Sequence, residues 1–323
     1  MSVETFDTHQ GGHMLDASGV KRPAVAVMCE AGALFDVRYP PSGWERPMGL
    51  GAEYPLVQSG VHKGRPRHKY VVRADTEQVL GLHSHAYPET RGGYRFLADI
   101  ADTTFPNSTV ACTLFGVGEK VAVVQRLGEA IDLGDGDWIH PEILWTSSFN
   151  GKWATAAHNS TVRFVCQNQI VNSHSLLKVR HTVNHDNLVE MRASILEKAI
   201  YRAESIANMA RILKDQTYTN GQFSDLINTL IPKNYKDQSV QTFRLASRKH
   251  DALWDYWCKE RDRDQTVGPN RWQAYNAVQG AEQHVINSTV RRQVKPERAL
   301  EKAINGKTPL ADGAMRVLYK GEG

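Results

Sequence analysis

Short apolar runs, each closed by turn-forming residues, follow one another through the first half of the chain. They are rich in valine and end at Gly, Pro or Asp, a pattern that indicates β-strands. The runs are VAVMC (25–29), YVVRAD (70–75), STVACTLFGV (108–117), KVAVVQRL (120–127) and VRFVCQNQI (162–170). The short loop GVGE between the third and fourth runs contains two glycines and predicts a β-hairpin.

The spacing of the apolar residues changes after about residue 184. From Asn187 onward they recur at intervals of three, four and seven, which define one face of a long amphipathic helix. The residues on this face are Leu188, Met191, Ile195, Ala199, Ile206, Met209 and Leu213. Further helices are predicted over 240–259, 271–287 and 296–305, the last because Pro296 suits a helix start and Asn305-Gly306 a helix end.

These patterns together predict an α+β fold. We expect an antiparallel or mixed β-sheet in the N-terminal half, packed by the long helix and followed by a helical C-terminal part. The predicted organisation is an N-terminal segment over residues 1–34 and a single α+β domain over residues 35–323. That domain would be β-rich over 35–178 and helical over 184–323. No low-complexity linker separates the two halves, which favours one domain over two.

The composition adds few constraints. Hydrophobic residues make up 41% of the 323 residues, which is ordinary for a globular protein. No run reaches the 18 or more apolar residues of a membrane span, and the polar start of the chain does not resemble a signal peptide. We therefore expect a cytoplasmic protein without membrane contact. The four cysteines form no CxxC pair, so neither a disulfide scaffold nor a structural zinc site is predicted.

One string has the composition of a metal site. HSHAYPE places His83 and His85 on one face of a strand, and Glu89 follows four residues later. The spacing is similar to the first cupin motif, but the glycines that frame that motif are missing. A surface or substrate-facing role is the competing interpretation. Cys166 has no base beside it in the chain, so a small buried residue is favoured over a nucleophile.

Basic residues gather in three places. The stretch HKGRPRHKY (62–70) contains Lys63, Arg65, Arg67 and Lys69 without an acid among them. A second group is Arg291, Arg292 and Lys295, and a third is Arg244, Arg248 and Lys249. Such groups neutralise phosphates, and nearby aromatic residues could stack on bases. The net charge of +4 permits a nucleic-acid partner without requiring one, and a solvated surface is the alternative.

No phosphate-binding loop is present. The chain contains no GxxxxGK[ST] string and no GxGxxG between a strand and a helix. We therefore expect neither a nucleotide-driven motor nor a cofactor, and the sequence leans away from an enzyme.

Four strings in order carry a family resemblance. They are YVVRADTEQVLGLHSHAYPE, WTSSFNGKWATAAHNSTVRFVCQNQI, VRHTVNHDNLVEMRASIL and NRWQAYNAVQGAEQH. They resemble the phage/plasmid-like protein family, a domain of unknown function (nine-three-two), over roughly residues 35–320. The matching positions are Arg73, Asp75, Gly81, Tyr87, Arg163, Cys166, Asn168, Arg180, His181, Thr182, Trp272, Asn276, Ala277 and Val278. Gln279 stands where the family usually has threonine.

The resemblance implies a function in DNA metabolism. Members of the family look like distant relatives of phage single-strand annealing proteins of the RecT and Rad type, which assemble into rings or filaments and bind DNA without hydrolysing ATP. By this analogy we expect a homo-oligomer that binds single-stranded DNA, with double-stranded DNA as a second candidate partner. The predicted contacts are Lys63, Arg65, Arg67, Lys69, Arg73, Arg163 and Arg180. Arg163 could equally be a structural salt-bridge partner.

Two alternative functions stay open. The first is a metal-dependent enzyme that uses His83, His85 and Glu89. The second is a viral protein that binds a host factor.

Overall fold

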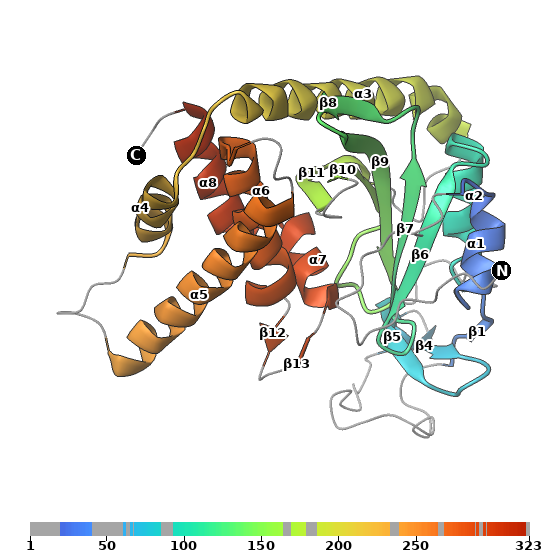
Figure 1. Cartoon of the computed structure of the whole chain (residues 1–323). Helices are drawn as coiled ribbons and strands as arrows, with labels where there is room; N and C mark the ends of the chain where they lie inside the picture. Colours follow the sequence, from blue (N-terminus) through green and yellow to red (C-terminus); the bar gives the residue numbers. More distant parts are fainter. Residues whose placement is uncertain are drawn as a thin grey trace.

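The computed structural model describes residues 20–40, 61–62, 65–66, 68–84, 93–163, 169–178, 186–232, 239–263, 268–287, 289–290, 293–294 and 296–320. Strands make up most of the first half and helices most of the second (Figure 1). The predicted α+β class is therefore confirmed: antiparallel sheets come first, and a long helix and a helical part follow.

A six-stranded antiparallel sheet forms the centre of the N-terminal half. Its strands are β6 (Thr109–Phe115), β7 (Lys120–Arg126), β8 (Ile131–Gly134), β9 (Asp137–Ser148), β10 (Ala156–Arg163) and β11 (Gln169–Lys178). They are ordered β11-β10-β9-β7-β6, and β8 pairs with β9 outside this path. β6 and β7 form the predicted hairpin, in which Cys112 lies opposite Val123.

A smaller antiparallel sheet packs at one end of the large one. Its strands are β1 (Val37–Arg38), β4 (His68–Arg73) and β5 (Val79–Ser84), in the order β1-β4-β5. The predicted strand over 70–75 overlaps β4 over residues 70–73. Two short strand pairs complete the β-structure: β2 (Val61–His62) with β3 (Arg65–Pro66), and β12 (Thr289–Val290) with β13 (Gln293–Val294).

The run VRFVCQNQI belongs to two strands, which corrects the prediction of a single one. β10 ends at Arg163, β11 begins at Gln169, and the two strands pair antiparallel with Val162 opposite Gln169. Residues 164–168, including Cys166, lie outside the described part of the chain. β11 is consequently the last strand before the long helix.

The run VAVMC is helical, which corrects the prediction of a strand there. It lies in α1 (Ala24–Glu30), which packs against α2 (Arg95–Thr104). The backbone N–H groups of Ala24 and Val25 donate to the carboxylate of Asp102 in α2, at 2.6 and 3.1 Å. A helix N-terminus needs such acceptors. Here the acceptor comes from a distant residue, which is invisible in a local pattern of five apolar residues.

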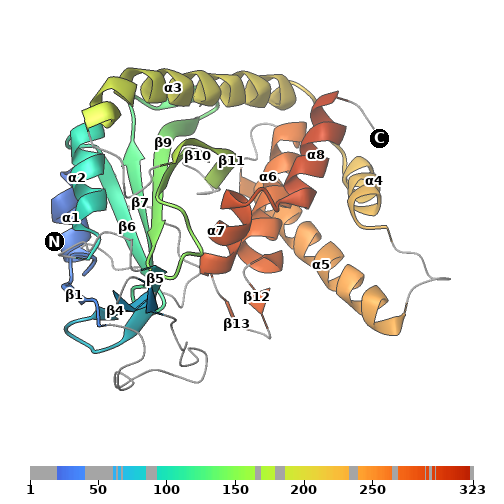
Figure 2. The same ribbon diagram turned by 180° about the vertical axis from the view of Figure 1, so that it is seen from behind.

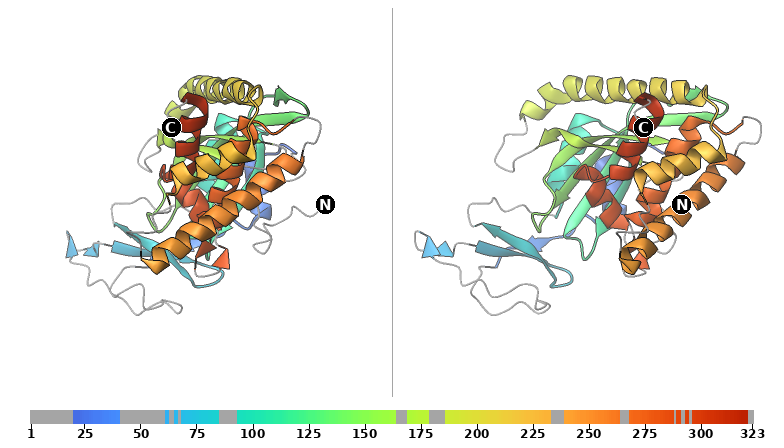
Figure 3. Two further views of the ribbon diagram at one scale, coloured as in Figure 1. Left: turned by 60° about the vertical axis from the view of Figure 1, so that its left-hand side comes forward. Right: turned by 90° about the vertical axis from the view of Figure 1, so that its left-hand side faces the viewer.

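The long predicted helix is α3 (Asp186–Lys214), which lies across the end of the large sheet (Figures 1 and 3). Four alanines at spacings of three and four are fully buried on its inner side: Ala199, Ala203, Ala207 and Ala210. Side chains this small let the helix backbone approach its neighbours closely. The amide of Asn159 in β10 accordingly donates to the carbonyl oxygen of Ala199 at 3.3 Å.

The C-terminal part consists mainly of helices. They are α4 (Asn220–Leu230), α5 (Val240–Arg263), α6 (Arg271–Ala281), the π-helical turn η1 (Glu282–Ile286), α7 (Pro296–Ile304) and α8 (Pro309–Lys320). The predicted helices over 240–259 and 296–305 correspond to α5 and α7, and the one over 271–287 divides into α6 and η1. No helix in the described ranges is both long enough and apolar enough to cross a membrane.

Two large apolar clusters hold these layers together. One lies between the large sheet and α1, α2 and the first half of α3, and includes Trp145 and Ile195. The other joins α4, α5, α6 and α8 to the second half of α3, and it also includes Leu133 and Ile139 of the sheet. Because the second cluster draws on both halves, the helices of the C-terminal part are packed directly onto the β-structure.

Candidate nucleic-acid interface

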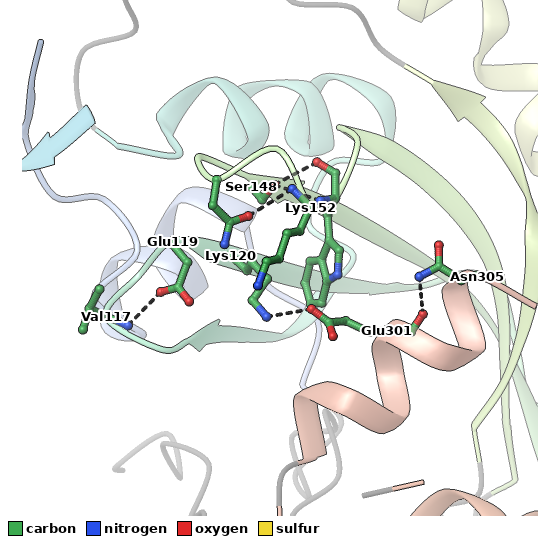
Figure 4. A network of polar contacts seen from close by, with 9 residues as sticks. Val117, Glu119, Lys120, Ser148, Lys152, Glu301 and Asn305 are labelled. Carbon is green, nitrogen blue, oxygen red and sulfur yellow. Dashed lines mark hydrogen bonds and ion pairs between the residues drawn. The ribbon is translucent and has the colours of Figure 1, made fainter. Parts of the chain in front are cut away.

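Helix α7 lies between the large sheet and the C-terminal helices (Figure 2). A partly buried ion pair anchors it to the sheet, because Lys120 Nζ of β7 lies 2.8 Å from Glu301 Oε1 of α7 (Figure 4). The same ammonium group lies 5.3 Å from the centre of the Trp153 ring. The Lys120 side chain is only 5% exposed, so it depends on these partners to compensate its lost hydration. The position of α7 relative to the sheet is thereby well defined.

Two basic residues one turn apart lie on the same side of this anchored helix. Arg298 is exposed and Lys302 is half-buried, and Lys302 Nζ donates to Asn287 Oδ1 at 2.6 Å. Burial lowers the pKa of Lys302, and the positive charges of Arg298 and of Lys249 in α5 lower it further, while Glu282 opposes the shift. Lys249 and Arg298 therefore each lie close enough to repel the charge of Lys302. We call these three residues the cation cluster.

The cation cluster is poorly compensated. Neither Lys249 nor Arg298 forms an ion pair with any residue that the structure describes, and both are exposed. Like charges that outnumber the acids beside them are a common feature of sites that bind anions. The residues come from helices about fifty positions apart in the chain, so folding alone creates the cluster.

Helix α5 extends the positive surface. Arg244 and Arg248 are exposed and one turn apart, and no acid occurs in the helix before Asp251. Leu245 is 50% exposed and Val240 is 69% exposed, so apolar and cationic groups alternate over the first turns. These turns lie toward the same end of the molecule as β12 and β13, the lower end in Figures 1 and 2.

A pocket of about 70 Å³ opens beside the cation cluster, between α6, η1, α7 and α8. Its lining consists of Tyr275, Gln279, Glu282, Gln283, Asn287, Ala299, Ala303, Thr308, Ala311 and Asp312. Asn287 connects the two features, since it lines the pocket and also accepts the hydrogen bond from Lys302. The π-helical turn η1 supplies Glu282 and Gln283 to the lining, and Asn287 follows directly after it. π-helical turns occur frequently at functional sites.

The acidic residues of the pocket are partly structural. Glu282 accepts hydrogen bonds from the backbone N–H groups of Leu310 and Ala311, at 3.2 and 2.8 Å, and so caps the first turn of α8. Burial raises the pKa of Glu282 despite these bonds, and the nearby charge of Asp312 adds to the shift. Burial also raises the pKa of Asp312. A proton is therefore held more strongly at this pocket than on an exposed carboxylate.

The structure gives the two described cations of the predicted site intramolecular partners. Lys69 is 6% exposed and its Nζ lies 5.1 Å from the centre of the Tyr39 ring. Arg73 donates to both carboxylate oxygens of Asp75, at 2.8 and 3.1 Å, and stacks on Phe35. The Arg-x-Asp pair of the family resemblance thus forms one ion pair at the end of β4.

The other predicted contacts are described less fully. Only the backbone of Arg65 and Arg163 is described: Arg65 pairs with His62, and Arg163 lies opposite Ile139. Lys63, Arg67 and Arg180 lie outside the described residues. The nucleic-acid role of this whole set stays a prediction.

The possible metal site can be followed only at His83. Its Nε2–H donates to the carbonyl oxygen of Phe149 at 2.8 Å, and burial lowers its pKa. His85 and Glu89 lie outside the described residues. Among the residues that the structure describes, no three His, Cys, Asp or Glu side chains converge in a way that could hold a metal ion.

Lys249 belongs to one of the basic groups apparent in the sequence, whereas Arg298 and Lys302 belong to none of them. A local signal for the second pair existed, because residues four apart on a helix that begins at Pro296 face the same side. The spacing of residues along the chain gave no indication that this pair lies close to Lys249.

The family model described as Domain of unknown function (DUF932) matches residues 83–305. The chain therefore belongs to this family. The match begins in β5 and ends just after α7, so it covers the whole large sheet and the cation cluster. No curated protein and no solved structure matches the chain.

Proposed function

We propose that this protein binds single-stranded DNA through the surface formed by α5 and α7, and that it acts as an ATP-independent annealing protein encoded by a phage or plasmid. The observation that carries the proposal is the cation cluster, in which Lys249 and Arg298 have no acidic partner among the described residues. Phosphate groups are the anions that such a surface would meet in DNA. Their binding would relieve the repulsion that, together with the larger effect of burial, lowers the pKa of Lys302.

The geometry suits a backbone-directed mode of binding. Lysine and arginine contacts with phosphates release counterions and do not read the sequence. A strand held by its phosphates keeps its bases available for pairing with a complementary strand. The absence of a nucleotide-binding loop from the sequence supports a mechanism that needs no ATP.

Binding is tested by fluorescence anisotropy with a labelled 20-nucleotide single strand over a range of salt concentrations. We expect the double variant Lys249→Ala/Arg298→Ala to bind at least tenfold more weakly than the wild type at low salt. Its slope of log K against log salt should be smaller by about 1.4, which is 0.7 for each lost phosphate contact on a single strand.

A matched control removes two exposed positive charges elsewhere: Lys198 on α3 and Arg95 on α2, both changed to Ala. This control variant should keep the wild-type slope of log K against log salt. Equal losses in the two double variants would show that only net charge matters and would refute the location of the site. Failure of the wild type to bind any strand at low salt would refute the function itself.

Annealing is measured separately with two complementary oligonucleotides that carry a donor and an acceptor dye. The protein should accelerate pairing without ATP, and the double variant should accelerate it less. Binding without acceleration would leave a DNA-binding protein and exclude the annealing role.

A further inference from the structure

We infer that the pocket beside the cation cluster accepts one unstacked pyrimidine base of the bound strand, and that cytosine fits it best. This inference rests on the proposed function, since the cation cluster would hold the neighbouring phosphates. It adds a reason for the protein to prefer single strands, because bases in a duplex are paired and stacked and cannot enter a pocket.

The place of the pocket is the first argument. Asn287 lines the pocket and binds Lys302 Nζ at 2.6 Å. Phosphates held by Lys302 and Arg298 would therefore lie beside the pocket. Within one nucleotide a single sugar joins the base to the phosphate, so a strand held by these residues would carry a base close to the pocket.

The size of the pocket is the second argument. Its volume of about 70 Å³ is room for roughly five water molecules, at about 10–15 Å³ of such volume for each. That is about half of the roughly 150 Å³ cavity that encloses a benzene molecule, so the open pocket has room for one edge of a single six-membered ring. Three alanines, Ala299, Ala303 and Ala311, contribute to the lining, and the ring of Tyr275 supplies an aromatic surface.

The chemistry of the lining is the third argument. Gln279 and Gln283, one turn apart, bring carboxamides that both donate and accept hydrogen bonds. Glu282 and Asp312 bring carboxylates, and a carboxylate oxygen that accepts one backbone N–H has a second lone pair. Carboxylates accept hydrogen bonds from the amino group of cytosine. Thymine has a carbonyl oxygen at the corresponding position, which carboxylates would repel.

The test compares three labelled single strands of 20 nucleotides: oligo(dC), oligo(dT) and a strand made only of abasic sites. The cation cluster should bind all three, and the pocket should add affinity for bases alone. We expect the wild type to bind oligo(dC) about tenfold more tightly than the abasic strand, the size of effect that single base contacts produce. The affinity for oligo(dT) should lie between the affinities for these two strands.

Two variants locate the effect. Ala303→Leu fills the pocket, and Gln283→Ala removes a hydrogen-bonding group with less risk to the packing of α7. Both should lose most of the preference for oligo(dC) and keep the wild-type affinity for the abasic strand, which shows that the cation surface is intact. The Lys249→Ala/Arg298→Ala variant should instead weaken binding of all three strands in proportion.

The outcomes separate the two proposals. If the wild type binds no strand at low salt, the proposed function fails. If it binds all three strands equally, or if both pocket variants keep the preference for oligo(dC), the base pocket fails while the function stands. Cytidine 5′-monophosphate as a competitor should displace oligo(dC) only at millimolar concentration. A nucleotide that binds more tightly than the strand would overturn the assignment of the pocket to DNA.

Discussion

Glu142 is a fully buried carboxyl group on the face of the large sheet that α7 covers. Arg126 lies opposite it on β7, with its guanidinium 3.2 Å from Glu142 Oε1. Burial raises the pKa of Glu142 from 4.5 to about 7, although the charge of Arg126 and its hydrogen bond oppose the shift. Two residues away on the same strand, burial and the charges of Arg126 and Lys21 lower the pKa of His140 to about 4.

Glu142→Gln should change the pH dependence of stability. Between pH 4.5 and 7 the folded protein keeps a proton on Glu142 that the unfolded chain releases, so the wild type loses stability as the pH rises. The variant lacks this loss. The difference between its unfolding free energy and that of the wild type should therefore increase, in favour of the variant, by roughly 1.4 kcal/mol per pH unit across that window. The opposite effect of His140 cancels in the comparison.

Urea unfolding of both proteins at pH 5, 6, 7 and 8 measures this difference. At pH 5 Glu142 is protonated and is therefore neutral, as glutamine is. The unfolding free energy of the variant is expected to lie near that of the wild type at this pH. A difference that stays constant from pH 5 to 8 would show that Glu142 titrates normally.

Strand β5 shows how one element depends on a close backbone contact. A Cβ atom on Gly81 would overlap the carbonyl oxygen of Phe149 and lie 2.6 Å from its carbonyl carbon. The same carbonyl oxygen accepts the hydrogen bond from His83, two residues further along β5. The glycine of the family resemblance is thus explained by the contact between the small sheet and the end of β9.

Gly81→Ala should destabilise the protein by about 3 kcal/mol, because backbone atoms on both sides must move apart. Urea unfolding measures the change. Gly221→Ala in α4 is the matched control, since a Cβ there meets only Thr219 Oγ1 at 3.8 Å. Alanine favours helix over glycine, so the control should gain up to about 1 kcal/mol. A loss of less than 1 kcal/mol in Gly81→Ala would mean that β5 moves easily.

At the scale of the whole molecule, the helical part and the sheet share contacts that neither could make alone. Trp272 Nε1 of α6 donates to Asp137 Oδ2 of β9 at 3.2 Å, and Lys120 of β7 pairs with Glu301 of α7. The apolar cluster of the C-terminal helices also contains Ile139 of β9. Separating the halves would expose this cluster and break these polar contacts together.

We therefore predict one cooperative unfolding transition for the chain, as a single domain requires. Tryptophan fluorescence and circular dichroism at 222 nm should give the same urea midpoint. Gly81→Ala, whose lesion lies in the small sheet, should shift both signals equally, although most of the 222 nm signal comes from the C-terminal helices. Two transitions, or a shift in fluorescence alone, would indicate two domains.

The local pattern of apolar residues was sufficient for elements in which it continues over many residues or is closed by a clear turn. The 3.6-residue period of α3 and α5 extends over many turns, and the valine-rich runs of β6 and β7 are joined by a glycine-containing turn, so their type and order could be predicted. Short runs are different, because five apolar residues suit a strand or a helix equally. VAVMC became helical where Asp102 of α2 could cap it, and VRFVCQNQI was divided between two strands.

The amino-acid order alone thus determined the fold class, the placement of a β-rich half before a helical half and the family resemblance, because these depend on neighbours along the chain. The candidate site was decided only by folding. Lys249 and Lys302 are brought close because α5 and α7 both pack against η1, and Asn287 and Asp312 meet at the pocket between α6, η1, α7 and α8. Charge and hydrogen-bonding groups act through space, and the distance between two residues in space is not contained in their spacing along the chain.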